Sequence, residues 1–226
     1  MGCNYFERWY GINDDSCGFG RIMRLIVITT ERFFDREADA VCQLFENGLE
    51  RLHLRKPCAS IDETSRLIEQ IDAAFHPKIV LHDHYELVNS FRLAGIHLNR
   101  RNHFGDQSSY EDKALTLSCS CHSFEEVAIC PANLDYVFLS PVFDSISKAG
   151  YKQGFTAEQL SDARNRGMLN ERVIALGGMT AESIPAIRVY GFGGVAVLGS
   201  LWAGFAADGN TGGLLERFGK LKTKCK

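Results

Sequence analysis

The sequence predicts a small (β/α)8 barrel, an α/β fold whose functional site lies at the carboxyl ends of parallel strands. Short apolar segments recur along the chain, and amphipathic segments separate them. Each connection is long enough to hold a helix, which favours parallel pairing of the strands. Eight such units close naturally into a barrel. A doubly wound open sheet is the competing architecture.

The elements follow one another in a regular order. The expected strands are residues 24–29, 49–54, 78–82, 95–98, 114–119, 136–140, 172–176 and 194–199. The expected helices are residues 36–48, 61–75, 85–95, 123–130, 156–167 and 180–191. Asp62, Thr156 and Thr180 are the expected helix caps, and Gly48, Gly95, Gly167 and Gly191 mark the expected helix ends. Residues 99–113 form the weakest unit, because polar sequence stands where a helix is expected.

We expect three parts in the chain. Residues 1–23 form an N-terminal extension, residues 24–205 the barrel, and residues 206–226 a C-terminal helix or tail. The extension lacks the basic and then apolar order of a secretory signal. Met23 stands directly before the first strand, so one hypothesis is that translation starts there.

Composition narrows the class of function. The 226 residues carry a net charge of -3 and are 45% hydrophobic. Basic residues are scattered, and apolar runs stay below the ~18 residues of a membrane span. We therefore expect a cytoplasmic protein with a small-molecule substrate and no nucleic-acid or membrane partner; a homo-oligomer stays open.

The eight cysteines include Cys119 and Cys121, which lie two residues apart in an expected strand and before His122. Zinc sites usually have wider spacing and a second ligand pair. We interpret these thiols as small buried apolar groups, because free cysteine is among the most buried residue types.

Polar residues gather where the expected strands end, and these residues are the candidates for the site. They are Thr29, His53, Arg55, Lys56, His82, Asp83, Asn99, Ser120, His122, Ser140, Lys148, Gly177, Gly178, Gly199 and Ser200. Alternation along a strand places His53 with Arg55 on one face. It likewise places Ser118, Ser120 and His122 on one face, opposite the cysteines. We expect both polar faces to point into the barrel.

Glycines end the last two expected strands. Gly177 and Gly178 precede a helix expected to begin near Thr180, and Gly199 and Ser200 end the next unit. Glycine lets backbone N–H groups approach a ligand, and a helix N-terminus attracts anions. Adjacent sites of this kind form the usual phosphate cup of such barrels. A pair of tight turns is the alternative interpretation.

Seven motifs in order resemble the thiamin phosphate synthase/TenI superfamily over about residues 24 to 205. They are HLRKP (53–57), VLHDH (80–84), GIHLN (95–99), SCSCHSFEEV (118–127), DYVFLSPVFDSISKAG (135–150), VIALGGMT (173–180) and GVAVLGS (194–200). The resemblance implies one of two activities. A synthase joins pyrimidine methyl diphosphate to thiazole phosphate, releases pyrophosphate and uses Mg²⁺. A TenI-type enzyme isomerises a carboxylated thiazole phosphate to its aromatic tautomer without a metal.

The synthase pattern is only partly present at the pyrophosphate half of the site. Asp83 matches a Mg²⁺ ligand of the synthases, but His82 and His84 replace an Asn and an Arg. Asn102 replaces the second metal carboxylate. His53 resembles the TenI type. Asp83 is therefore a tentative metal ligand, with a hydrogen bond to His53 or to the loop as its other role.

The thiazole half matches well. By resemblance the substrate contacts are Arg55, Ser120, Ser145, Ser147, Lys148, Gly177, Gly178, Gly199 and Ser200. Arg55 would meet a carboxylate or phosphate, or form a structural ion pair. His122 is the candidate general acid/base, because imidazole titrates near neutrality, and His53 is the second candidate.

This asymmetry favours a TenI-like thiazole tautomerase, which needs no cofactor. One alternative is a thiamin phosphate synthase with Mg²⁺, whose substrates are pyrimidine diphosphate and thiazole phosphate. Another is a non-catalytic barrel that binds thiamin or thiazole phosphate.

Overall fold

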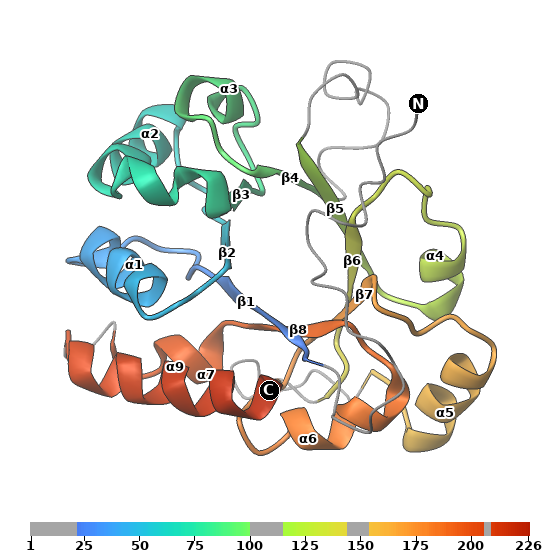
Figure 1. The fold of residues 1–226 in the computed structure, drawn as a ribbon. Coiled ribbons are helices and arrows are strands. Elements are labelled where there is room, and N and C mark those ends of the chain that lie inside the picture. Colours follow the sequence, from blue (N-terminus) through green and yellow to red (C-terminus); the bar gives the residue numbers. More distant parts are fainter. Residues whose placement is uncertain (1–21, 100–114, 144–153, 206–208) are drawn as a thin grey trace, which may run out of the picture.

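Parallel strands close into one barrel in the computed structural model of the chain (Figure 1). The structure describes residues 22–99, 115–143, 154–205 and 209–226. Each strand pairs in parallel with its neighbour in the sequence, and β8 pairs with β1. The prediction of a (β/α)8 barrel is confirmed, and the open sheet is excluded. The N-terminal extension proposed for residues 1–23 lies almost wholly outside the described residues.

The strands match the expected segments closely. They are β1 (Arg24–Ile28), β2 (Arg51–Leu54), β3 (Ile79–Leu81), β4 (Gly95–Leu98), β5 (Thr116–Cys121), β6 (Tyr136–Leu139), β7 (Val173–Leu176) and β8 (Gly194–Val197). The largest difference is at β5, which runs two residues beyond its expected end. Ser120 and Cys121 pair with Phe138 and Leu139 of β6, and this ladder extends the strand.

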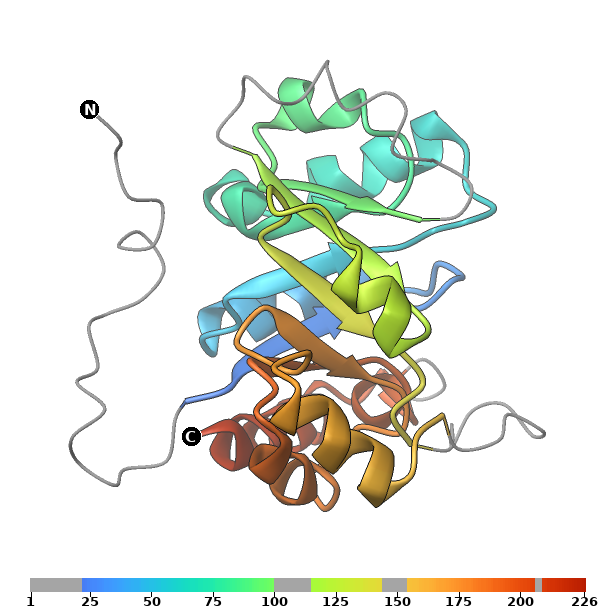
Figure 2. The ribbon, with the colours of Figure 1, turned by 90° about the vertical axis from the view of Figure 1, so that its right-hand side faces the viewer.

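The helices surround the barrel (Figures 1 and 2). They are α1 (Glu37–Glu46), α2 (Ile61–Gln70), α3 (Leu87–Phe91), α4 (Phe124–Ala128), α5 (Ala157–Asn165), α6 (Ile184–Ile187), α7 (Gly199–Trp202) and α9 (Thr211–Cys225). Two 3-10 segments add Ala73–Lys78 and Arg188–Tyr190. None of the helices within the described ranges combines the length and the apolar character that a membrane crossing requires.

Two of the expected helix starts are wrong. The cap of α2 is Ser60 rather than Asp62, because Ser60 forms a reciprocal capping box with Glu63. Thr180 does not start α6, which begins at Ile184. Its hydroxyl instead accepts hydrogen bonds from the backbone of the two residues before α6, at 3.2 Å each. Thr156 does cap α5, in a capping box with Gln159.

Glycines end several units as expected. Gly48, Gly167 and Gly191 have φ values of 88°, 74° and 83°, which favour glycine. Gly95 does not end α3. Arg92 takes the left-handed position there, and Gly95 opens β4.

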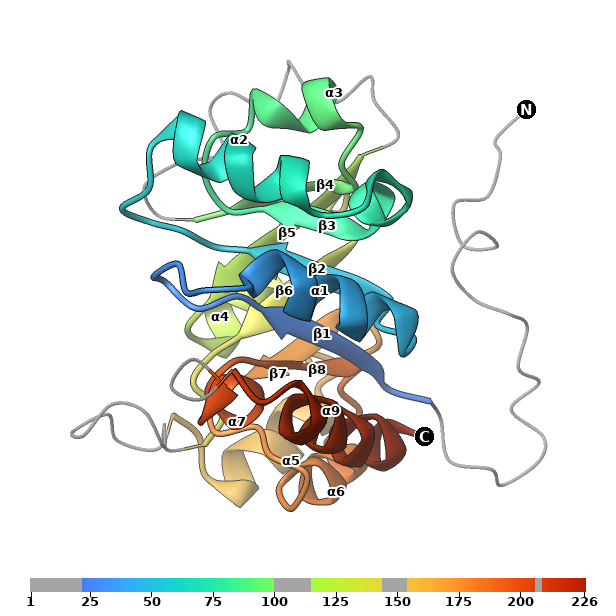
Figure 3. The same cartoon turned by 90° about the vertical axis from the view of Figure 1, so that its left-hand side faces the viewer.

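The C-terminal helix α9 covers the barrel beside α7 and below β1 (Figure 3). The backbone N–H of Met23 donates to the carbonyl of Cys225 at 2.8 Å, which joins the entry of β1 to the end of α9. The apolar face of α9 buries Leu214, Phe218 and Leu221 against the barrel layer. The chain therefore holds its two ends of described sequence together.

The barrel interior is filled by apolar and histidine side chains. The apolar members are Ile26, Ile28, Tyr136, Phe138, Ile174 and Ala196. His53, His82 and His97 lie among them, one each on β2, beside β3 and on β4, and all are buried. The imidazoles of His82 and His97 stack with ring centroids 4.2 Å apart. We call these three residues the histidine cluster.

Hydrogen bonds link the histidine cluster to four strands or strand ends. His53 Nδ1 lies 2.9 Å from His82 Nε2, and His53 Nε2 lies 2.6 Å from the Tyr136 hydroxyl. His97 bonds to the hydroxyls of Ser118 and Ser120, at 2.9 and 2.8 Å. Buried polar groups are stable when they are hydrogen-bonded in this way.

Burial keeps these imidazoles neutral. Desolvation lowers the pKa of His53 well below its ordinary value, and it lowers the pKa of His97 to about 3. A neutral imidazole has one donor and one acceptor, so each ring is satisfied by its two partners.

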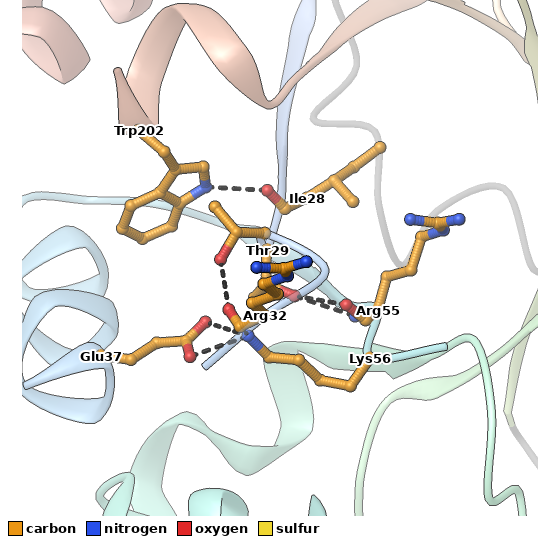
Figure 4. Close-up of polar contacts among 8 residues, drawn as sticks. Ile28, Thr29, Arg32, Glu37, Arg55, Lys56 and Trp202 are labelled. Carbon is orange, nitrogen blue, oxygen red and sulfur yellow. Dashed lines mark hydrogen bonds and ion pairs between the residues drawn. The ribbon is translucent and has the colours of Figure 1, made fainter. Parts of the chain in front are cut away.

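A buried ion pair fixes the end of β2 against α1 (Figure 4). Lys56 Nζ lies 2.7 and 2.8 Å from the carboxylate oxygens of Glu37, and it donates to the Arg32 carbonyl at 2.9 Å. The two side chains are only 1% and 2% exposed. Desolvation lowers the pKa of Lys56 and raises that of Glu37, while their mutual attraction opposes both shifts.

We expect the histidine cluster to make stability depend on pH. The folded-state pKa of His97 lies below its unfolded value, so the unfolded chain binds more protons as the pH falls below about 6.5. The contribution of His97 is present above that pH and is lost on acidification. Its share is about 2 kcal/mol of unfolding free energy between about pH 7 and about pH 5. Denaturant unfolding of wild type and His97→Asn at several pH values measures it; equal pH slopes for the two proteins would contradict the assignment.

Removing one partner of the buried ion pair should destabilise the fold strongly. Lys56→Met leaves the Glu37 carboxylate buried without its cation, which costs about 3–5 kcal/mol of unfolding free energy. The double variant Lys56→Met/Glu37→Gln should recover most of that loss. Lys220→Met, which removes an exposed ion pair with Glu216, is the control and should change stability little. Additive losses in the double variant would show that the two groups are not coupled.

Candidate active site

Most of the described candidate residues lie at one end of the barrel, because parallel strands all end there. Arg55 follows β2, Asp83 follows β3, Ser120 ends β5 and His122 follows it. Gly177 and Gly178 follow β7, and Gly199 and Ser200 follow β8. Ser145, Ser147, Lys148 and Asn102 lie outside the described residues.

His122 is an exposed side chain whose orientation is fixed by two contacts. Its backbone N–H donates to the Glu126 carboxylate at 2.6 Å, and its Nδ1 lies 3.0 Å from the carbonyl oxygen of Ser140. A carbonyl only accepts, so Nδ1 carries the proton in this contact. The Nε2 atom is then the proton acceptor, and it makes no hydrogen bond to another residue within the described ranges. Sequence reasoning missed the part of Glu126, although an acid four residues after the histidine was the available signal.

Ser120 points inward as predicted. Its hydroxyl contacts His97 Nε2 at 2.8 Å, and the residue is half-buried. Cys119 and Cys121 point outward into the layer between strands and helices, also as predicted. Ser120 therefore joins the histidine cluster to the mouth of the barrel.

The structure does not support His53 as a catalytic residue. Its exposed fraction is 0%, and both ring nitrogens are occupied by His82 and Tyr136. Since these partners take both nitrogens, Asp83 is not the hydrogen-bond partner of His53 either. His53 is a positioning residue, and the missing signal was the set of partners on β3 and β6, which are distant in sequence.

Arg55 reaches the mouth of the barrel, whereas Lys56 does not. The Arg55 side chain is 29% exposed, and its guanidinium donates to the Glu31 carboxylate at 2.7 Å. Its backbone is held by the Thr29 hydroxyl, which accepts from the Arg55 N–H at 2.9 Å (Figure 4). An ion pair this exposed is weak, so the guanidinium can exchange Glu31 for a stronger anion. The ion pair expected as an alternative thus exists at the mouth and not in the interior.

The residues after β3 offer a poor site for Mg²⁺. Asp83 is half-buried and supplies one carboxylate. His84 has a positive φ of 54° and donates from Nε2 to the Ala59 carbonyl at 2.8 Å. The Asn99 amide donates to the His82 carbonyl. Mg²⁺ prefers oxygen ligands, and among the described residues after β3 and β4 only Asp83 is a carboxylate. These residues do not form a complete Mg²⁺ site by themselves.

The glycine-rich turn after β7 has a backbone that only glycine allows. Gly177 and Gly178 have φ values of 97° and 66°. A Cβ on Gly177 would lie 2.9 Å from Pro141 Cα, which is too close for any side chain. The Gly178 carbonyl accepts from the Ser183 hydroxyl at 3.1 Å.

The turn after β8 carries a polar atom directed into the protein. Helix α7 begins at Gly199, directly after the strand. The Ser200 hydroxyl is buried and has no hydrogen-bond partner within the part of the chain that the structure describes. A buried hydroxyl without a partner costs free energy unless a ligand or water satisfies it. The helix dipole expected after β7 is absent near Thr180, and the turn after β8 is the one that leads directly into a helix.

Comparisons with known proteins agree with this arrangement. The family model described as thiamine monophosphate synthase matches residues 25–201. A solved structure of thiamine phosphate pyrophosphorylase from Bacteroides thetaiotaomicron is 41% identical, with a TM-score of 0.79, and the match covers 89% of this chain and 97% of that one. Thiamine-phosphate synthases from Bacteroides fragilis and Bacteroides thetaiotaomicron are 26% and 25% identical. These matches cover 69% and 79% of this chain and 80% and 88% of those proteins.

The family model spans most of the barrel, from β1 to the start of α7. The relatives are enzymes of thiamin biosynthesis, so the prediction of an enzyme of either the transferase or the isomerase type is confirmed. The chain belongs to the thiamine monophosphate synthase family, within the thiamin phosphate synthase/TenI superfamily.

Proposed function

We propose that the protein is a TenI-type thiazole tautomerase, which moves a proton on a carboxylated thiazole phosphate to give the aromatic tautomer. The observation that carries this proposal is the state of His122. The Ser140 carbonyl holds its Nδ1–H, so Nε2 is an oriented base at the barrel mouth.

The cationic groups near the site support the same choice. Departure of pyrophosphate builds negative charge that needs Mg²⁺ and several cations. Lys56 is buried against Glu37, and Arg55 is paired with Glu31. His84, which replaces an arginine of the synthase pattern, is bound to a carbonyl. One phosphate and one carboxylate make a smaller demand, which Arg55 and the glycine turns can meet.

The relatives from one organism add support. Bacteroides thetaiotaomicron provides the 41% identical solved structure and a curated synthase that is 25% identical. Such different identities over similar lengths indicate two different proteins. This chain resembles the first more strongly, so the role of the second is not simply transferred to it.

The residues would divide the reaction between them. The turns at Gly177–Gly178 and Gly199–Ser200 would bind the phosphate through backbone N–H groups and the Ser200 hydroxyl. Arg55 would orient the carboxylate, and Ser120 would contact the thiazole. Ser145, Ser147 and Lys148 remain proposed substrate contacts. His122 Nε2 would take a proton from the ring and return it at another ring position.

The first test is turnover of the carboxylated thiazole phosphate, followed by its absorbance change and by proton exchange in D₂O. His122→Ala should lower kcat by about 10²–10⁴-fold, the usual contribution of a positioned acid/base. His84→Gln, at the same barrel end, is the matched control and should keep most of the activity. Asp83→Asn and EDTA should change the rate little. Full activity in His122→Ala would contradict the proposal.

Thiamin phosphate synthase is the second candidate, favoured by the names of the relatives and by Asp83. It would need Mg²⁺ and pyrimidine methyl diphosphate beside thiazole phosphate. We expect no thiamin phosphate by mass spectrometry when the protein is incubated with these substrates and Mg²⁺ alongside an active synthase. Product that disappears with EDTA and in Asp83→Asn would establish the synthase instead. Binding of thiazole phosphate without turnover in either assay would identify a non-catalytic barrel.

A further inference from the structure

The outer face of β5 carries a group of thiols that the proposed reaction does not use. Cys119 and Cys121 alternate with Ser118 and Ser120, so the thiols face the helix layer while the hydroxyls face the barrel interior. Cys130 follows α4, and this short helix folds back over the same face. We call Cys119, Cys121 and Cys130 the thiol cluster.

The three sulfur atoms form a compact triangle. The Sγ atoms of Cys121 and Cys130 are 3.3 Å apart, those of Cys119 and Cys130 are 3.6 Å apart, and those of Cys119 and Cys121 are 4.0 Å apart. A cation about 2.3 Å from each sulfur needs separations of about 3.8 Å in a tetrahedral site and about 4.0 Å in a trigonal one. The triangle meets this requirement with small side-chain movements.

Two other readings fit the triangle less well. A disulfide needs sulfur atoms about 2.0 Å apart, so even the nearest pair would have to close by more than about 1 Å, and the third thiol would remain. Independent packing of small apolar groups explains Cys119 and Cys121, as the sequence predicts. It does not explain why Cys130, from a different element, completes the triangle.

The environment suits metal binding. Cys119 and Cys121 are 4% and 1% exposed, whereas Cys130 is half-buried and gives access from solvent. Hydrogen bonds from the thiols of Cys119 and Cys121 lower the pKa of Cys130, which favours the thiolate that a metal requires. Three sulfur ligands leave a fourth position for water.

We propose that the thiol cluster binds one thiophilic cation of the Zn²⁺ or Cu(I) class on the outer face of β5. Soft thiolates select such ions over Mg²⁺, so this site is separate from the phosphate chemistry at the barrel mouth. The bound ion would cross-link β5 to the segment after α4. Loading needs no redox step, because each ligating thiol only loses its proton.

Titration of the reduced full-length protein with Co²⁺ tests the proposal, since thiolate ligands give charge-transfer absorption in the near ultraviolet and tetrahedral Co²⁺ gives visible bands. We expect one Co²⁺ per chain, displaced by Zn²⁺. Cys130→Ser should weaken binding by more than about 100-fold, beyond the loss typical of an outer-shell partner. Cys58→Ser, at an exposed cysteine outside the cluster, is the control and should bind like wild type.

A rescue variant separates ligand loss from misfolding. Cys130→His restores a nitrogen ligand and should recover binding with shifted visible bands. Circular dichroism of each variant without metal checks the fold. Equal affinity in wild type and Cys130→Ser, or the absence of a thiolate charge-transfer band, would overturn the proposal. So would a Cys121–Cys130 disulfide that forms in place of metal binding.

Discussion

The interior of the barrel depends on burying imidazoles without charging them. A closed eight-stranded barrel has a core that side chains must fill. This chain fills part of it with the histidine cluster, which is stable only because Tyr136, Ser118 and Ser120 satisfy its nitrogens. Each ring is neutral because the low-dielectric interior penalises a charge. The network couples β2, β4, β5 and β6, so a change in one imidazole affects the geometry of several strands.

The same network reaches the mouth of the barrel through Ser120. The inner end of the proposed site is therefore set by the core and not by a loop. His122 stands two residues further along β5, where its Nδ1 is fixed by the Ser140 carbonyl after β6. A base held by a backbone carbonyl keeps one tautomer, which suits repeated proton transfer. Packing in the core and chemistry at the mouth are thus linked along one strand.

Charge at the mouth is arranged differently from charge in the interior. Lys56 and Glu37 form a closed pair that serves the packing of β2 against α1. Arg55, one residue earlier, holds an exposed partner that it can exchange for a substrate anion. The step of one residue changes the direction of the side chain, and this separates a structural cation from one available to a ligand. The outward face of β5 follows the same rule, with thiols on one side and hydroxyls on the other.

The sequence by itself determined the barrel, the order of its units, and most of the strand-end candidates. Apolar periodicity and short connections leave few other ways to bury these strands, and alternation showed which residues of β2 and β5 face inward. Helix starts at Ser60 and Ile184 were missed, because capping depends on local hydrogen bonds that several nearby polar residues could make. Only the tertiary structure placed His53 among His82, His97 and Tyr136, paired Lys56 with Glu37, and brought Cys130 to Cys119 and Cys121. Those partners come from separate elements, and their meeting depends on barrel closure and helix packing, which no local pattern encodes.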